Sequence, residues 1–209
     1  MSTHAALDDG IDLSRVLAGF ASPIDDAQRA FRATLEAMSY PGRVVRPLAA
    51  DPQWPEELPA AAVAVLLALC DEHTPLWFGP RWRKQAAIID SLRFHTGAPV
   101  TEDPSLAAFA VHDGIGDPSP ERFALGDDLD PQRGATLIVA VVALDRGTRL
   151  RLSGPGLREA REIAVTGPEP RFWQARCAIE PLFPRGLDLL LTAGASLVAI
   201  PRTTRVEVL

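Results

Sequence analysis

The chain of 209 residues contains only two cysteines, Cys70 and Cys177, and they lie far apart with no CxxC spacing. Two isolated thiols argue against a zinc site and against a disulfide framework, and they are typical of a reducing compartment. The first ten residues include acids and no apolar core, so they lack the pattern of a secretory signal. We therefore expect a cytoplasmic protein.

A long hydrophobic run is also missing. The longest, from Ala60 to Cys70, has eleven residues, whereas a helix that crosses a bilayer needs ~20. Positive charge is not in excess either, because 21 basic residues stand against 27 acidic ones, for a net charge of -6. Such a chain is not expected to bind nucleic acid or an anionic membrane surface. The expected partners are proteins or small molecules.

The motifs of familiar catalytic and metal sites are absent from the sequence. There is no G-x-S-x-G elbow, no Walker loop, and no G-x-G-x-x-G between a strand and a helix. The histidines lie in separate segments without metal-site spacing, at His4, His73, His95 and His112. The acidic run 127–130 lacks the glycine and the closing glutamate of a calcium loop. We predict neither a catalytic residue nor a bound metal.

Hydrophobic residues make up 47% of the chain, which is enough for one substantial core. We therefore expect a single domain over residues 1–209, with a polar N-terminal lead at 1–21. An acidic connection rich in glycine and proline spans 113–131. Because it is long for a loop, we expect it either to hold a short helix around 121–125 or to form a contact surface.

The last quarter of the chain carries the clearest structural signal. Two short apolar runs, Leu187 to Leu191 and Leu197 to Ile200, are punctuated by glycine and proline and predict two strands joined by a tight turn. Strands that are apolar throughout need cover on both faces. The fold class predicted here is therefore α/β, with a mixed β-sheet sandwiched between helix layers.

Helical spacing and β-branched runs predict the remaining elements. Ser22 and Pro23 resemble an N-cap and a first helical residue, and the helix that follows places Phe31 and Leu35 on its apolar face. The run from 136 to 144 is apolar and rich in β-branched residues, so we expect one central strand there. The other predicted elements are helices at 59–70, 81–97 and 170–179, strands at 76–78 and 107–111, and a hairpin of 148–152 with 163–166.

Polar residues gather where the C-terminal strands end. Arg185 and Asp188 lie at the start of the first strand and could form a local pair, while Arg202, Thr203 and Thr204 follow the second. Arginine and hydroxyl groups suit an anion such as phosphate or carboxylate. Ion pairing of the arginines with the chain's many acids is the alternative, and it is favoured here as the more ordinary arrangement.

Two further features are candidates for a ligand or interface role. The S-G-P-G segment predicts a turn in which Gly154 and Gly156 flank a proline, and its alternative is a close backbone approach to a ligand or partner. His95 lies at the end of a predicted helix, where capping of the last carbonyls is favoured over a role as a base.

Several of these segments together resemble the H-subunit family of the bacterial carbon-phosphorus lyase system, which breaks down phosphonates. They occur in the same order along most of the chain: F-R-A-T-L-E-A-M-S-Y-P-G-R at 31–43, S-L-R-F-H-T-G at 91–97, L-S-G-P-G at 152–156, R-G-L-D-L-L-L-T-A-G at 185–194 and L-V-A-I-P-R-T-T-R-V-E at 197–207.

The resemblance implies a fold like the large domain of pyridoxal-phosphate-dependent transferases, but without the cofactor. It also implies a homodimer within a core complex of G, I and J subunits, which with an L subunit transfers a phosphonate to the ribose of a nucleoside triphosphate. A Schiff-base enzyme needs a lysine, and Lys84, the single lysine of the chain, lies in a basic stretch instead of beside a strand end. We therefore expect no pyridoxal phosphate.

Three functional hypotheses remain open on the sequence. The leading one is an accessory subunit of the complex without catalytic residues of its own. The second is a degenerate transferase that binds a phosphorylated ligand through Arg185, Arg202, Thr203 and Thr204. The third is a stand-alone pyridoxal-phosphate enzyme that uses Lys84.

Overall fold

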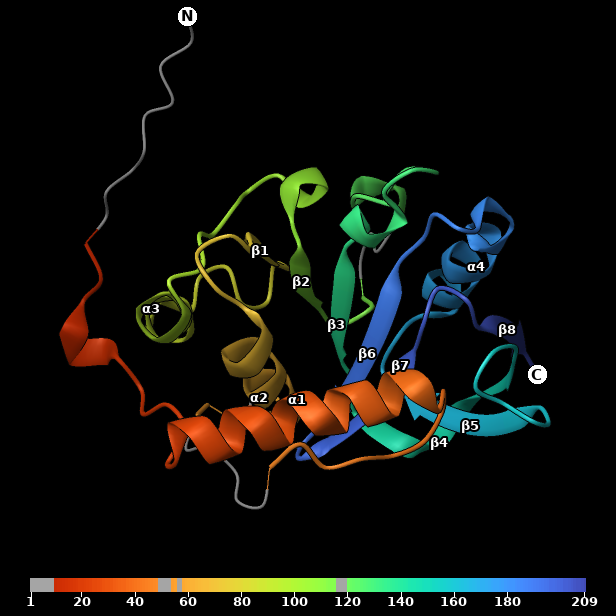
Figure 1. The fold of residues 1–209 in the computed structure, drawn as a ribbon, viewed down its shortest axis with the longest axis horizontal. Coiled ribbons are helices and arrows are strands. Elements are labelled where there is room, and N and C mark those ends of the chain that lie inside the picture. Colours follow the sequence, from red (N-terminus) through yellow and green to blue (C-terminus); the bar gives the residue numbers. More distant parts are fainter. Residues whose placement is uncertain (1–9, 49–53, 56–57, 116–119) are drawn as a thin grey trace, which may run out of the picture.

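The computed structural model describes residues 10–48, 54–55, 58–115 and 120–209, so that His4 and parts of the predicted lead and acidic connection lie outside it. Four α-helices and eight strands make up the described fold (Figure 1). In chain order they are α1 (Pro23–Ser39), α2 (Ala60–Leu69), β1 (Leu76–Phe78), α3 (Ala86–Thr96), β2 (Phe109–His112), β3 (Thr136–Ala140), β4 (Ala143–Ser153), β5 (Arg161–Thr166), α4 (Pro170–Ala178), β6 (Asp188–Ala193), β7 (Ser196–Ile200) and β8 (Arg205–Val208).

The larger sheet has five strands in the order β1-β2-β3-β6-β7. Neighbouring strands are parallel from β1 to β6, and β6 and β7 form an antiparallel hairpin whose register places Leu189 opposite Ile200. The tight turn after β6 contains Gly194 with φ near 50°, a conformation that glycine adopts without a steric cost. The prediction of an α/β fold with a mixed sheet is confirmed, and so is the C-terminal hairpin.

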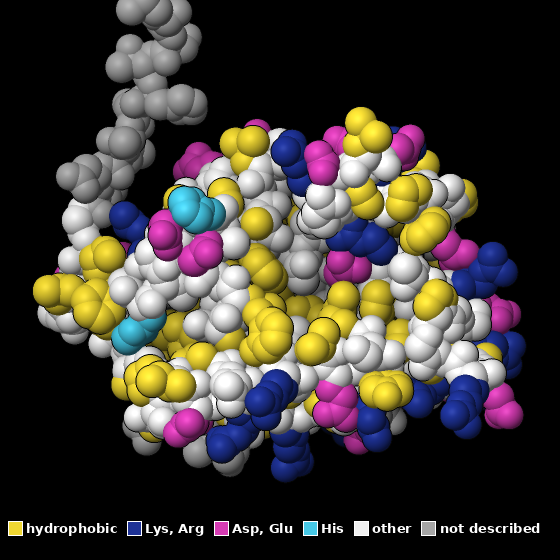
Figure 2. Space-filling model, viewed as in Figure 1, with side chains coloured by type: hydrophobic (Ala, Val, Ile, Leu, Met, Phe, Trp, Pro, Cys, Tyr) yellow, Lys and Arg dark blue, Asp and Glu magenta, His cyan; other side chains and the backbone are white. Residues whose placement is uncertain are grey.

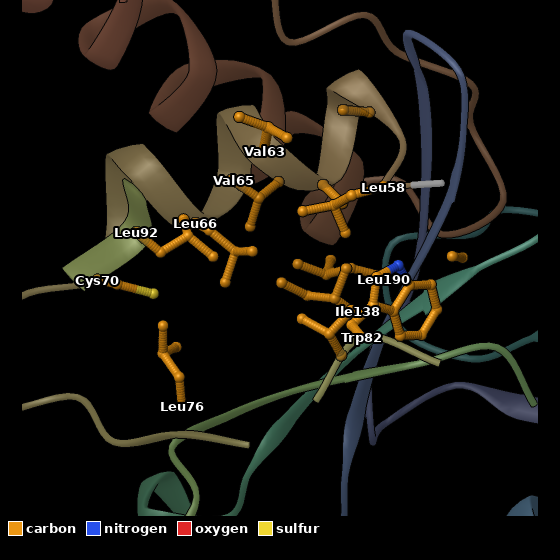
Figure 3. Packing of buried hydrophobic residues seen from close by; sticks show 14 of the residues in the cluster. Leu58, Val63, Val65, Leu66, Cys70, Leu76, Trp82, Leu92, Ile138 and Leu190 are labelled. Carbon is orange, nitrogen blue, oxygen red and sulfur yellow. The ribbon is translucent and has the colours of Figure 1, made fainter. Parts of the chain in front are cut away.

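The two faces of this sheet are covered differently. Side chains alternate, so that Ile138 and Leu190 pack with α1, α2 and α3 in one hydrophobic cluster, while Leu137 and Leu189 pack in a second cluster on the other face. Figure 3 shows the first cluster, in which Val65 of α2 points toward Ile138 and Leu190. The second face is covered by α4 together with a three-stranded sheet, not by helices alone as the sequence predicts, because β4, β5 and β8 also have an apolar face to bury.

The apolar run 136–144 does not form one strand, so that prediction is wrong. β3 ends at Ala140, and β4 begins at Ala143 in the other sheet. The amide of Val141 still donates to Thr192 of β6, whereas the amide of Val142 donates to Thr166 at the end of β5. The chain therefore changes partners within two residues, and apolar composition alone does not show where this happens.

The smaller sheet has the order β5-β4-β8 and contains the predicted hairpin of β4 with β5. Its edge strand β8 lies beside α4, where the thiol of Cys177 donates to the carbonyl of Val206 at 3.2 Å. The guanidinium of Arg176, one residue earlier on α4, donates to the carbonyl of Thr204 just before β8 at 3.1 Å. Helix α4 thus supplies donors to carbonyl groups along this edge.

Helix α3 begins at Ala86, five residues later than the sequence predicts. Arg81, Arg83 and Lys84 lie in the turn that precedes it, where Arg83 N–H donates to the carbonyl of Gly79. Positive charge at the start of a helix opposes the helix dipole, and the turn removes most of that conflict. Helix α3 ends as expected at Gly97, which has φ near 73° and caps Arg93.

The apolar face expected for α1 is only partly correct. Ala30, Thr34 and Ala37 are buried, while Phe31 and Leu35 are 50% and 55% exposed. Hydrophobic side chains gather across the part of the surface where α1 lies, with basic side chains along its lower border (Figure 2). No helix in the described part of the chain is long and apolar enough to cross a membrane.

Candidate functional site

The hairpin of β6 and β7 brings together two of the predicted site residues, Asp188 and Arg202. Asp188 is the first residue of β6, and Arg202 follows the end of β7, so that the antiparallel register places them side by side. Arg202 Nη2 lies 2.6 Å from Asp188 Oδ2, and the Arg202 amide donates to Asp188 Oδ1 at 2.8 Å. Both side chains are nearly buried, at 13% and 14% exposure. This is a strong, charge-assisted pair in a poorly solvated place.

The remaining donors of Arg202 reach the segment before β3. Its Nη1 donates to the carbonyl of Pro131, and its Nη2 also donates to the carbonyl of Gly134 at 3.4 Å. The guanidinium is therefore engaged on all sides by acceptors of the protein itself. These hydrogen bonds link the end of the acidic connection, at Pro131, to the hairpin of β6 and β7, so Arg202 stabilises the fold.

The local pair expected between Arg185 and Asp188 does not form, so this prediction is wrong. The chain bends at Gly186, whose amide donates to the carbonyl of Leu125, and the bend turns Arg185 away from β6. Arg185 Nε instead lies 3.4 Å from Asp128 in an exposed pair. Ion pairs of this kind contribute little to stability.

The two threonines after β7 have different surroundings. The Thr204 amide donates to Pro201 in a tight turn, and its side chain is fully buried, whereas Thr203 is exposed. Arg205 extends outward to Glu180 at 2.8 Å. We call Asp188 and Arg202 to Arg205 the C-terminal corner. A hollow of about 390 Å³ lies over it, lined by Ser153, Gly154, Glu180, Phe183, Arg202, Thr203 and Arg205.

The predicted turn at residues 154–157 is confirmed, with Leu157 N–H donating to Gly154 at 3.2 Å. Gly154 has φ near 127°, and a β-carbon there would lie 2.9 Å from the carbonyl oxygen of Thr203. A β-carbon on Gly156, with φ near 82°, would lie 2.4 Å from the carbonyl oxygen of Ser39. The close approaches that these glycines allow are thus to the protein's own backbone, in the corner and at the end of α1.

Arg176 of α4 is part of this region and is not predicted by the sequence. It is 1% exposed, and its Nη2 donates to Pro201 and Thr204 at 3.1 Å each. Its Nε and Nη1, the indole nitrogen of Trp173 and the hydroxyl of Thr204 have no partner within the described residues. Burial lowers the pKa of Arg176, and the charges of Glu180 and Asp188 oppose this effect. The spacing of Arg176 three residues after the buried Trp173 is the signal that could have revealed it.

His95 does not cap its own helix, contrary to the sequence interpretation. Its Nε2 donates to the carbonyl of Leu17 at 2.8 Å, and Ser91 accepts from the amide of Leu17 at 2.8 Å. The indole of Trp54 donates to the carbonyl of Ala18. His95 therefore helps to hold the N-terminal segment against α3, and the carbonyl that it binds lies far away in sequence.

The described residues contain no group of three or more His, Cys, Asp or Glu side chains arranged to hold a metal ion. Lys84, which the third hypothesis requires, is exposed in the turn between β1 and α3.

Comparisons with known proteins give a consistent result. A family model described as bacterial phosphonate metabolism protein (PhnH) matches residues 18–207. The chain is 39% identical over 197 residues to the alpha-D-ribose 1-methylphosphonate 5-triphosphate synthase subunit PhnH of Rhizobium meliloti (strain 1021), which covers 93% of this chain and 97% of the relative. It is 34% identical over 182 residues to the putative C-P lyase subunit protein HtxG of Stutzerimonas stutzeri, covering 86% and 85%.

Proposed function

Because this chain belongs to the family of the bacterial phosphonate metabolism protein PhnH, we propose that it is an accessory subunit of the carbon-phosphorus lyase complex in phosphonate catabolism. The resemblance stated from the sequence is confirmed at the level of the family. The observation that carries the proposal is the extent of the match, which reaches from residue 18 to residue 207 and includes all four α-helices and all eight described strands except the last residue of β8. The complex would make alpha-D-ribose 1-methylphosphonate 5-triphosphate, the product in the name of the Rhizobium relative.

The contacts of the C-terminal corner support a role without catalysis. Its nearly buried arginine, Arg202, is engaged with Asp188 and with the backbone carbonyls of Pro131 and Gly134, so it serves the fold. The outer face of α1 supports a role in assembly, because Ile24, Phe31 and Leu35 are exposed on one helix. Exposed apolar side chains grouped in this way are a feature of protein interfaces.

The finer parts of the proposal follow the family. The chain would form a homodimer, contact the G, I and J subunits, and act in the cytoplasm without pyridoxal phosphate. A likeness to the large domain of pyridoxal-phosphate-dependent transferases is supported by four parallel strands packed against helices. A single domain is supported by the second hydrophobic cluster, which joins residues of both sheets.

Co-expression tests this function. A tagged copy of the chain is expressed with the G, I and J subunits, purified through the tag and analysed by size-exclusion chromatography. We expect one complex that contains all four proteins. Leu35→Glu on α1 should weaken it, whereas Leu106→Glu, at a leucine that is 64% exposed elsewhere, serves as the matched control. If the chain elutes free of the other subunits, the proposal fails.

A phosphorylated ligand in the hollow of the C-terminal corner is a second candidate function, favoured by the hollow itself and by Arg202, Thr203 and Arg205 in its wall. Arg205 is the arginine there that can be released, because its pair with Glu180 is largely exposed on the arginine side. Calorimetric titration with a nucleoside triphosphate should then show binding that Arg205→Ala abolishes. No heat with either protein would exclude this function.

A further inference from the structure

A second hollow lies at the edge of the larger sheet, beside β1 and apart from the C-terminal corner. Leu76 pairs outward with the neighbouring segment, since its amide donates to Pro99 and its carbonyl accepts from Thr101. This pairing stops after Leu76, and the open edge beyond it borders a space of about 260 Å³, which we call the β1 hollow. Its walls are Trp77, Phe78, Arg83, Ile89, Val100, Thr101 and Glu102.

Trp77 is a rigid wall of the β1 hollow with an unused donor. Its ring stacks on His112 at a centroid distance of 6.0 Å and meets the edge of Phe123 at 5.4 Å. The residue is 3% exposed. Its indole N–H donates no hydrogen bond within the described part of the chain. The nitrogen is not among the buried polar atoms of the described residues that lack a partner, so this N–H is accessible from the hollow and could donate to a ligand there.

Arg83 adds a positive charge above this ring. Its guanidinium carbon lies 5.8 Å from the centre of the Trp77 ring, and it forms no ion pair with the described residues. Arg81 and Lys84 lie in the same exposed turn but do not line the hollow. Glu102 is the single acid of the walls. Arg83 therefore differs from Arg202, whose charge is matched by Asp188.

The backbone supplies a further donor. Successive residues of a strand turn their amides to opposite sides, so every second residue faces the same side, and the amide of Leu76 faces outward to Pro99. The amide of Phe78 consequently faces the same open edge. An anionic head group in the hollow would thus meet the Arg83 guanidinium, the Trp77 indole N–H and the Phe78 amide, while Ile89 and Val100 offer apolar contact to a short carbon chain.

From this combination we propose that the β1 hollow binds a small alkylphosphonate, with the phosphono group at Arg83 and the alkyl group against Ile89 and Val100. The hollow is smaller than the roughly 300–1,000 Å³ of sites for larger ligands, which fits an alkylphosphonate and not a nucleoside triphosphate. The assignment rests on the proposed function, because membership in a phosphonate system is what selects phosphonate among small oxyanions.

The test is calorimetric titration of the purified full chain with ethylphosphonate, inorganic phosphate and propionate. Ethylphosphonate should bind more tightly than the other two, because phosphate lacks the alkyl group and propionate lacks the dianionic head. Arg83→Ala should weaken binding by about tenfold or more, the effect of losing one hydrogen bond between charged groups. Glu102→Gln should tighten binding by about threefold, because it removes a like charge from the wall.

Lys84→Ala is the matched control, since it removes a neighbouring cation that does not line the hollow, and it should change binding by less than about twofold. Arg83, Lys84 and Glu102 are all exposed, so the variants are expected to fold, which melting curves will verify. Equal binding of phosphate or propionate, or an unchanged affinity of Arg83→Ala, would overturn the assignment. Complex formation with the other subunits without phosphonate binding would overturn this inference alone and leave the proposed function standing.

Discussion

Arg202 and Arg83 both line a hollow, but only Arg202 is satisfied by the protein. Arg202 is nearly buried and donates to Asp188 and to two backbone carbonyls. Arg83 is exposed above Trp77 and has no carboxylate partner among the described residues. An arginine whose donors are engaged stabilises the fold, whereas one whose donors are free is available to a ligand. The C-terminal corner and the β1 hollow therefore differ mainly in whether the protein itself accepts the hydrogen bonds of the arginine, and less in how many charges each contains.

The largest expected effect is in the C-terminal corner. Arg202→Ala leaves Asp188 nearly buried without a partner, and breaking such a pair costs about 3–5 kcal/mol. Urea denaturation should show this loss in the free energy of unfolding. Arg205→Ala removes an arginine that is 74% exposed and should cost about 0.5 kcal/mol or less. Equal losses in the two variants would show that burial of the ion pair does not decide how much an arginine of this corner stabilises the fold.

A smaller effect concerns the core behind the β1 hollow, which contains Cys70 and Leu76 (Figure 3). Burial raises the pKa of the Cys70 thiol from 9.0 to about 12. The unfolded chain loses this proton near pH 9 and the folded chain only near pH 12, so the stabilisation is complete below pH 9 and is lost as the pH rises through 12.

Between pH 8 and 10.5 the wild-type protein should therefore lose about 2 kcal/mol through Cys70. Urea denaturation at both pH values measures the loss, and Cys70→Ala should lack this part of it. Cys177→Ala is the comparison. Burial raises the pKa of its partly buried thiol and the charge of Arg176 opposes that rise, so this variant should keep the part of the loss that belongs to Cys70. An identical pH dependence in wild type and Cys70→Ala would show that water reaches this core.

The smallest expected effect is at the β1 hollow. Arg83→Ala removes only a cation above an aromatic ring, so it should change the free energy of unfolding by less than about 1 kcal/mol. The measurement is the same urea denaturation that is used for Arg202→Ala. A loss as large as that of Arg202→Ala would mean that Arg83 is part of the fold and that the contrast between the two hollows is false.

Elements with strong local signals could be predicted from the sequence. The apolar runs and glycines of β6 and β7 are enough to predict their hairpin, and Gly154 to Leu157 predicts its turn. The pairing of Asp188 with Arg202 was within reach as well, because the register of that hairpin places the two residues side by side. We instead expected Asp188 to pair with Arg185, which is nearer in sequence. The bend at Gly186 separates those two residues, so sequence distance does not predict which residues form an ion pair here.

Other features depend on contacts that no local pattern records. The division of 136–144 between two sheets follows from which strands lie beside it, not from its composition. His95 finds its acceptor in Leu17, 78 residues earlier. The walls of the β1 hollow come from a strand, a turn and a later loop, so Trp77, Arg83 and Thr101 meet only in the folded chain.

The cover that α4 gives to β8 also affects the behaviour of the protein at high concentration. An uncovered edge strand can template pairing with another chain and so begin aggregation. Arg176 and Cys177 occupy the carbonyls of Thr204 and Val206 along that edge, so a foreign strand finds these acceptors already taken. The polar end of α4 thereby protects the protein against unwanted self-association, in addition to holding the corner together.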